Sequence, residues 1–266
     1  MSAYLTKNPV AWAFHQNTVR WPHNTLEPAT DASDEPFFKE YLRAPIRALP
    51  LPVPVTMPLA EAIAARVSCR RFANDPIRLA ALSALLKAAY GVQGIVSIGA
   101  AEHHERPVPS GGGLYPLELY VLARHVESLA PGVYHYAPLT HLLEEVRVLP
   151  LPDGLVSQMF MGQNYLAKAG AIVVMTAVFE RSLFKYGDRG YRYILFEAGH
   201  VAQNINLTAI TVGLGSFNLG GFFDAYLAGL VGLNLEEEVP IYAVALGVPG
   251  SSDRVEQRVV EGMWEA

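Results

Sequence analysis

A lysine and a tyrosine, Lys185 and Tyr186, stand side by side before a Gly-Asp turn and a long aromatic, charge-studded helical segment. With free pKa values of about 10.4 and about 10, both are poor bases at neutral pH. In a partly dry site, burial disfavours the lysine cation and an adjacent cation stabilises a phenolate, so each is expected to lower the pKa of the other. The pair is a candidate general base if Gly187–Asp188 turns both side chains the same way. An exposed lysine without chemistry is the simpler alternative.

A basic stretch supplies a second candidate, because Arg66, Ser68 and Arg70 alternate along the chain. Alternate residues of an extended segment point the same way. Two guanidinium groups with a hydroxyl group between them suit a phosphate. Cys69 is expected to face away from them. A basic surface strip with no ligand is the alternative.

Two glycine-rich stretches would let bare backbone approach a flat or anionic ligand, since glycine has no Cβ. The first, PSGGG at 109–113, lacks the lysine of a P-loop. The second, GLGSFNLGGFFD at 213–224, follows a helical segment and lacks the spacing of a dinucleotide fingerprint. His103 and His104 have no acidic or cysteine partner at ligand spacing, so no metal site is predicted.

Composition limits the classes of function. The chain has 266 residues, 51% of them hydrophobic, and a net charge of −5, which indicates a globular protein without general attraction for nucleic acid or anionic membranes. The single Cys69 excludes an internal disulfide and a cysteine-based zinc site. The beginning of the chain has no signal-peptide pattern. The most apolar run, 169–179, is shorter than the roughly 20 residues that span a bilayer. A soluble, cytoplasmic protein is expected.

Apolar periodicity predicts the elements that position these candidates. Expected helices cover 59–68, 79–90 with a stop at Gly91, 153–170, 189–213 and 222–233. Expected strands cover 114–124, 171–179 and 239–250, with a hairpin over 132–148. This order favours an α+β or α/β domain over 58–266.

The segment 1–57 is expected to be an arm or linker. It includes a short helix candidate near Pro9, and prolines at 45, 50, 52, 54 and 58 predict an extended strap without helix or ladder pairing. On the long helix, Glu197, His200 and Asn204 share one face. They form either a polar network near a site or satisfied core residues, and the sequence leaves both open.

Five segments occur in order along residues 59–250: RVSCRRF, RPVPSGGGLYPLELYV, KYGDRGYRYILFEAGHVAQNINL, LGGFFD and YAVALGVPG. Together they resemble the nitroreductase-fold flavoproteins. More closely, they resemble the SagB-type branch, which holds the azoline dehydrogenases of thiazole- and oxazole-modified peptides. The resemblance implies an α+β, three-layer sandwich with a mainly antiparallel central sheet flanked by helices. It also implies an intertwined homodimer with FMN at the interface between the two copies.

The resemblance also implies a role for each candidate residue. Arg66, Ser68 and Arg70 would bind the phosphate and ribityl chain of FMN. Pro109, Ser110 and Gly111 would touch the isoalloxazine ring, in part from the other subunit, and Gly220 and Gly221 would lie beside flavin N5. Arg254 would complete the phosphate site. Lys185 and Tyr186 match the Lys-Tyr pair that distinguishes the azoline dehydrogenases from ordinary nitroreductases. They would be the catalytic pair.

The expected function is oxidation of azoline rings to azoles in a peptide or small natural product, with O₂ as electron acceptor and a ring-forming cyclodehydratase as a partner. Two other functions stay open. One is an NAD(P)H-dependent nitro- or quinone reductase, which needs no protein base. The other is a flavin-binding subunit without catalysis of its own.

Overall fold

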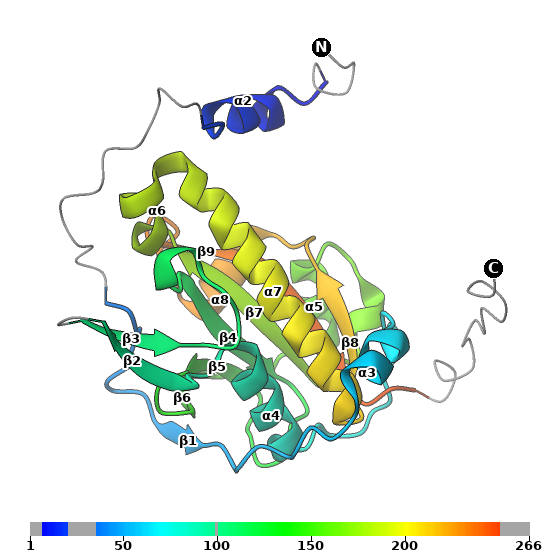
Figure 1. Ribbon diagram of the computed structural model, residues 1–266. Coiled ribbons are helices and arrows are strands. Elements are labelled where there is room, and N and C mark those ends of the chain that lie inside the picture. The colour runs from blue at the N-terminus through cyan, green and yellow to red at the C-terminus, as the bar shows by residue number, and fades with distance from the viewer. Residues whose placement is uncertain (1–6, 21–35, 99–100, 251–266) are drawn as a thin grey trace, which may run out of the picture.

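The structure, a computed structural model, describes residues 7–20, 36–98 and 101–250. Within these residues, a seven-stranded sheet has the order β1-β6-β5-β4-β7-β9-β8, and every neighbouring pair is antiparallel (Figure 1). The strands are β1 (Ile46–Ala48), β4 (Leu117–Ala123), β5 (Gly132–Ala137), β6 (Leu142–Val148), β7 (Ala171–Val178), β8 (Gly215–Leu219) and β9 (Glu238–Gly247). A separate hairpin joins β2 (Gly94–Ile98) and β3 (Ala101–Glu105).

Helices precede, follow and cover this sheet. The α-helices are α2 (Pro9–Asn17), α3 (Leu59–Ala65), α4 (Leu79–Tyr90), α5 (Asp153–Met159), α6 (Glu180–Tyr186), α7 (Gly190–Thr211) and α8 (Asp224–Val231). Short 3₁₀ turns are η1 (Gly111–Gly113), η2 (Asn164–Leu166) and η3 (Gly187–Arg189). None of the helices that the structure describes is long and apolar enough to cross a membrane.

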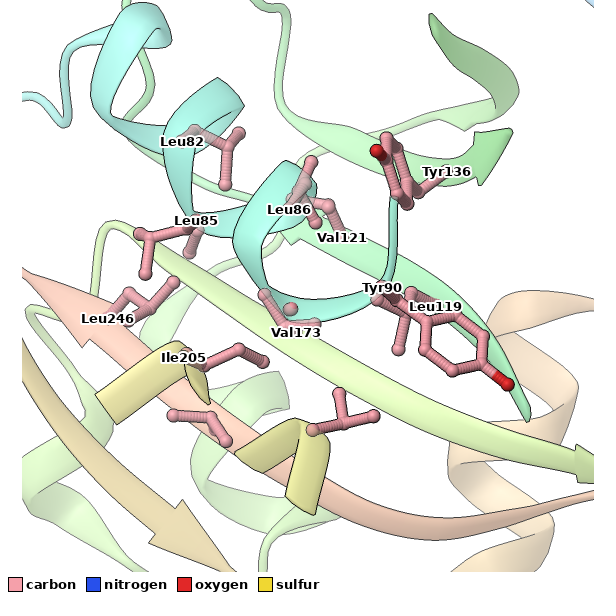
Figure 2. Packing of buried hydrophobic residues seen from close by; sticks show 14 of the residues in the cluster. Leu82, Leu85, Leu86, Tyr90, Leu119, Val121, Tyr136, Val173, Ile205 and Leu246 are labelled. Carbon is pink, nitrogen blue, oxygen red and sulfur yellow. The ribbon is translucent and has the colours of Figure 1, made fainter. Parts of the chain in front are cut away.

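The sheet has a hydrophobic core on each face, because the side chains of its central strands alternate. In β4, Leu119 and Val121 pack with α4 and α7, whereas Tyr120 and Leu122 pack with α5 and α8. Figure 2 shows the first core, with the leucines of α4 packed over β4 and β7 and beside Ile205 of α7. Both faces of β4 and β7 are fully buried. The three-layer α+β sandwich with an antiparallel sheet is therefore confirmed.

Three helices differ from the expectation. The helix expected over 153–170 is only α5, which ends at Met159, because Met161 and Gly162 both adopt positive φ and the short turn η2 follows. Helix α3 stops at Ala65 instead of 68, because the chain leaves it extended at Arg66 (ψ 112°) and Ser68 bridges Ser216 of β8. Helix α4 ends before Gly91, as predicted, but Gly91 has φ −67° and is not left-handed. A methyl group on Gly91 would lie 2.9 Å from Tyr136 Oη, so glycine is needed there for space.

Several short elements were not predicted. The prediction that the proline strap forms no ladder was wrong at β1, since Ile46 lies between the prolines and pairs with Glu144 of β6. The hairpin β2–β3 occupies a stretch for which no strand was predicted. Strand β8 occupies part of the second glycine-rich stretch. Helix α6 contains Lys185 and Tyr186, which were expected in a turn.

Besides β1, other described parts of the N-terminal segment pack against the domain. Phe14 of α2 lies edge-on to Tyr191 of α7, with 5.5 Å between ring centroids, and Arg189 Nη1 donates to Thr18 O at 2.6 Å. Farther along, the backbone N–H of Tyr41 donates to Glu144, and Lys39 pairs with Glu238. The division into an arm over 1–57 and a domain over 58–266 stays a prediction.

A buried ionic cluster ties α6 to the sheet. Arg181 of α6 lies 2.7 Å from Glu118 of β4, and Glu118 is also 3.0 Å from His135 of β5. Burial works to raise the pKa of Glu118, but the hydrogen bond from His135 and the charge of Arg181 outweigh it and lower the pKa to about 2. The cluster fixes the helix that ends with Lys185 and Tyr186.

Candidate functional site

Lys185 and Tyr186 are the last two residues of α6, which ends where Gly187 adopts φ 54°. Lys185 is exposed and Tyr186 half-buried. Lys185 Nζ lies 5.6 Å from the centroid of the Tyr186 ring. Arg20 donates to the carbonyl oxygen of Tyr186 at 2.9 Å. The two side chains are therefore neighbours at the end of a helix.

The first glycine-rich loop lies against this pair. A methyl group placed on Gly112 would be 2.6 Å from Tyr186 Oη and 2.9 Å from Lys185 Nζ. Gly112 has φ 67°, a conformation that glycine adopts without strain. Both side-chain ends therefore reach the same point of bare backbone, about 70 residues away along the chain.

Tyr193 of α7 completes this group and was missed by the sequence reasoning. Its ring stands edge-on to Tyr186, with centroids 4.9 Å apart and planes at 88°. A methyl group on Gly111 would lie 3.3 Å from the same ring. Tyr193 was assigned to no role because one aromatic residue in an amphipathic helix carries no local signal of a site.

The pKa of Tyr186 differs from the expectation. Burial raises it above its ordinary value, and the neighbouring Tyr193 raises it further. The expectation that the pair lowers the pKa of the tyrosine is therefore wrong. Tyr186 keeps its proton at neutral pH and can donate a hydrogen bond, which leaves the Lys185 amine as the candidate base.

The buried carboxyl group of Glu197 binds the first glycine-rich loop through Ser110. Tyr90 Oη donates to Glu197 Oε1 at 2.6 Å, and Ser110 is also hydrogen-bonded to Glu197. Burial raises the pKa of Glu197 to about 7, against the opposing effect of these hydrogen bonds and of Arg106. The Ser110 hydroxyl also accepts the Tyr115 N–H at 2.9 Å. Glu197 thus connects α7 to the residue that precedes the glycines.

The polar face of α7 does not form one network. Glu197 is buried under the loop, whereas His200 is exposed. Asn204 donates to the Ala88 carbonyl of α4 at 3.2 Å, a helix–helix contact. Glu197 fits the interpretation of a polar residue near a site, and Asn204 fits that of a satisfied core residue.

The second group of candidates lies along β8. Cys69 is buried (4% exposed), while Ser68 and Arg70 are exposed, so Cys69 faces away from both, as expected. Val67 is exposed as well (59%), and that Arg66 points the same way as Ser68 and Arg70 stays a prediction. The Arg70 guanidinium stacks 4.5 Å from the centroid of Phe217 in β8. Arg66 is half-buried at the end of α3. Neither Arg66 nor Arg70 has an ion-pair partner among the described residues.

Gly220 and Gly221 follow the other end of β8. Gly220 is exposed, and Gln163 donates to the Gly221 carbonyl at 3.1 Å. At about 3.3 Å per residue, β8 places Gly220 roughly 13 Å from Ser216, the partner of Ser68. Ser68, Arg70 and the two glycines therefore line one elongated edge. Arg254 lies outside the described residues.

The chain keeps these two groups apart. Lys185 and Tyr186 directly precede α7, whereas Ser68 bridges the strand that follows it. With 22 residues at about 1.5 Å each, α7 is roughly 33 Å long. Figure 1 shows α6 at one end of α7, and α3 and β8 towards the other. One copy of the described residues does not bring all the predicted site residues around one point.

Comparisons with known proteins agree with this fold. The profile of the nitroreductase family matches residues 63–248. The protein MJ1384 of Methanocaldococcus jannaschii, a relative named for that family, is 36% identical over 190 residues, which are 71% of this chain and 90% of the relative. The microcin B17-processing protein McbC of Escherichia coli is 36% identical over 146 residues, 53% of this chain and 54% of McbC.

Two solved structures extend the comparison. A nitroreductase-like protein from Anabaena variabilis superposes with a TM-score of 0.72 at 26% identity, covering 89% of this chain and 46% of that chain. A chain of the E. coli microcin synthetase McbBCD complex, with truncated pro-MccB17 bound, superposes with a TM-score of 0.61 at 26% identity. The match covers 91% of this chain and 92% of that chain. The chain thus spans about half the length of McbC and of the Anabaena protein.

Proposed function

The chain belongs to the nitroreductase family, and we propose that it is an FMN-dependent dehydrogenase that oxidises azoline rings to azoles in a peptide or peptide-like natural product. One observation carries this proposal: the ends of Lys185 and Tyr186 meet at the bare backbone of Gly112. A reductase of the same family would need no protein base at that position. The similarity to McbC, a peptide-processing protein, supports a peptide substrate.

The residues of this chain fit FMN. Arg66, Ser68 and Arg70 would hold its phosphate, since the two guanidinium groups have no carboxylate partner among the described residues. Backbone without side chains at 111–112 and 220–221 would lie against the flat ring, where a Cβ at Gly112 would collide with its neighbours. When bound, FMN supplies the acceptor for a hydride.

The protein residues would handle the proton. Converting an azoline to an azole forms a C=C bond and removes one hydrogen from each of two adjacent ring carbons. One hydrogen leaves with its electron pair, and the other leaves as a proton. We assign the proton to Lys185 Nζ, which becomes the ammonium, and a hydrogen bond that orients the substrate to Tyr186 Oη. A positioned base of this kind contributes about 10²–10⁴-fold to the rate.

The distance between the two groups of residues supports a homodimer. A second copy would bring its own Ser110–Gly112 loop to the Ser68–Arg70 edge of the first. Exposed apolar side chains on α7 and α3 favour such contact: Leu195 is 42% exposed, Phe196 57% and Ile63 57%. A methyl group on Gly199, on the same exposed side of α7, would meet nothing within 4 Å.

We also propose O₂ as the electron acceptor and a ring-forming cyclodehydratase as a partner. The partner is supported by the similarity to a synthetase complex that contains a bound pro-peptide. The ring atom, sulfur or oxygen, depends on the substrate that this partner would supply.

The experiment uses purified protein and a synthetic thiazoline-containing peptide. We expect flavin absorbance in the purified protein and a product that has lost two hydrogen atoms by mass spectrometry. Lys185→Ala should abolish azole formation while FMN stays bound. Lys168→Ala, which changes another exposed lysine, is the matched control and should behave as wild type. Protein that takes up no FMN would overturn the proposal.

The similarity to MJ1384, which spans more of this chain than McbC does, favours a nitro- or quinone reductase as the second candidate. In that case Lys185→Ala would reduce a quinone with NAD(P)H at nearly the wild-type rate. A flavin-binding subunit without catalysis would show no turnover of either substrate, even in wild type.

A further inference from the structure

A half-enclosed cavity of about 90 Å³ is lined in part by Gly113, the residue after the glycine that lies against Lys185. Its walls come from the segment before β1, from β3 and from the loop, and include Phe38, Glu102, His104, Arg106 and Tyr115. At about 30 Å³ per water molecule, it has room for roughly three waters, or for a carboxylate with one or two methylene groups. We call it the Arg106 cavity.

Arg106 is the unusual residue of this cavity. It is 7% exposed, and its guanidinium lies 4.2 Å from the ring centroid of Tyr90, 4.7 Å from that of Tyr115 and 5.2 Å from that of Phe38. Its Nε and Nη1 atoms have no hydrogen-bond partner in the part of the chain that the structure describes. Buried, unpaired donors on a cation are costly, so a ligand that accepts hydrogen bonds would relieve a real penalty.

The nearby acids are already engaged. Glu118 is paired with Arg181 and His135. Glu197 is hydrogen-bonded to Tyr90 and Ser110. Aromatic rings pack around the guanidinium and leave its buried Nε and Nη1 atoms without an acceptor among the described residues. A forked guanidinium matches the two oxygens of a carboxylate better than any other common group on a peptide.

The position of the cavity connects it to the proposed reaction. Gly113 lines the cavity, and its neighbour Gly112 touches Lys185 and Tyr186. A peptide with its ring beside Lys185 would need to extend past only these glycines to reach Arg106.

We propose that the Arg106 cavity binds a carboxylate of the substrate, either a peptide C-terminus or an acidic side chain. That the carboxylate belongs to the substrate rests on the proposed function, whereas the presence of a carboxylate site does not. The buried Arg106 cation attracts the carboxylate, and Glu102, the acidic residue in the wall, repels it. The cavity therefore selects substrates with a negative charge a short distance from the ring.

The test uses flavin-loaded protein and propionate, with propionamide as the uncharged analogue. Saturation-transfer NMR and calorimetric titration are expected to show binding of propionate and not of propionamide. Arg106→Gln should weaken propionate binding about 10- to 100-fold, the range for hydrogen bonds to a charged group. Glu102→Gln should strengthen it, because a like charge is removed. The Glu102 variant changes an exposed side chain, so it decides the question even where Arg106→Gln does not fold.

N-acetylglycine and the α-amide of N-acetylglutamate then distinguish a C-terminal carboxylate from an acidic side chain, and tighter binding of either one supports the proposal. Equal binding of propionate and propionamide overturns it, as does unchanged affinity in both variants. Arg106→Gln protein that loses FMN while propionate binding persists would assign the arginine to the cofactor and also overturn it. None of these measurements needs azoline oxidation, so failure of the carboxylate site and failure of the proposed function are distinguishable.

Discussion

The phenol oxygen of Tyr186 stands where the side chain of residue 112 would begin, since a methyl group on Gly112 would lie 2.6 Å from it. The two residues are far apart in the sequence, because Tyr186 ends α6 and Gly112 lies in η1. Their contact makes the loop a wall beside the proposed catalytic pair, and a side chain at 112 would have to displace the ends of both residues.

Replacing Gly112 by alanine should therefore remove activity. The new methyl group would displace both Tyr186 Oη and Lys185 Nζ, and the positive φ adds a strain of about 1 kcal/mol. Azole formation and thermal unfolding are measured together. Gly213→Ala is the matched control, because Gly213 has φ 79° and nothing within 4 Å of its Cβ position. A similar fall in Tm for both variants, with activity lost only at 112, is expected. Equal activity of the two would contradict the role of Gly112.

Replacing Arg70 by alanine should weaken FMN binding. Loss of a charge-assisted hydrogen bond to the phosphate costs about 1.5–3 kcal/mol, which raises the Kd of FMN roughly 10- to 100-fold. Quenching of flavin fluorescence measures the Kd. Arg78→Ala, at another exposed arginine before α4, should leave it unchanged. The same Kd in both variants would remove Arg70 from the phosphate site.

Glu197 should make the protein less stable as the pH rises. The raised pKa, about 7 against 4.5, means that the folded protein holds this proton more tightly than the unfolded chain. Its contribution to the free energy of unfolding is complete below pH 4.5, the pKa of the unfolded chain. That contribution is lost as the pH rises through about 7, the pKa in the folded protein. Melting curves across this window should show a falling Tm in wild type and a smaller slope in Glu197→Gln. An identical dependence of Tm on pH in both proteins would contradict the raised pKa of Glu197.

Breaking the buried pair of Arg181 and Glu118 should be costly. Arg181→Met removes the closest cation of the buried Glu118 and leaves it with His135 and the charge of Arg106, at an expected loss of about 3–5 kcal/mol in the free energy of unfolding. The lowered pKa of Glu118 also means that its contribution is present above 4.5 and lost as the pH falls towards about 2.

Urea denaturation measures this loss against a matched pair on the surface. Arg47 is 2.7 Å from Glu145, and its side chain is 50% exposed, so Arg47→Met should cost less than about 1 kcal/mol. If the two substitutions cost the same, the buried cluster does not anchor α6.

The long elements could be predicted because each is marked by periodic apolar residues. Strand β7 is a continuous buried run, and α7 has a stripe from Ile194 to Ala209 that faces the core. The short elements lack such marks. Strand β8 lies at the edge of the sheet and begins with glycine, and α6 has only 7 residues before Gly187 reverses the chain. Their existence depends on pairing with β9 and on Arg181, which no local pattern shows.

The candidate site divides in the same way. Lys185 and Tyr186 were found because they are adjacent, and Ser68 and Arg70 because they alternate. The contact of the pair with Gly112, the ring of Tyr193 and the raised pKa of Tyr186 were not predictable, because each arises from residues that fold together from distant parts of the chain.

The buried position of Cys69 has a practical consequence. Its sulfur is packed into the space that Gly215 leaves open, and it is the single cysteine of the chain. A maleimide spin label would therefore react with a cysteine introduced at an exposed position away from α7 and α3, such as Lys168, and leave the native thiol unlabelled. Pulsed electron resonance on such protein would report directly how far apart two neighbouring copies hold this position.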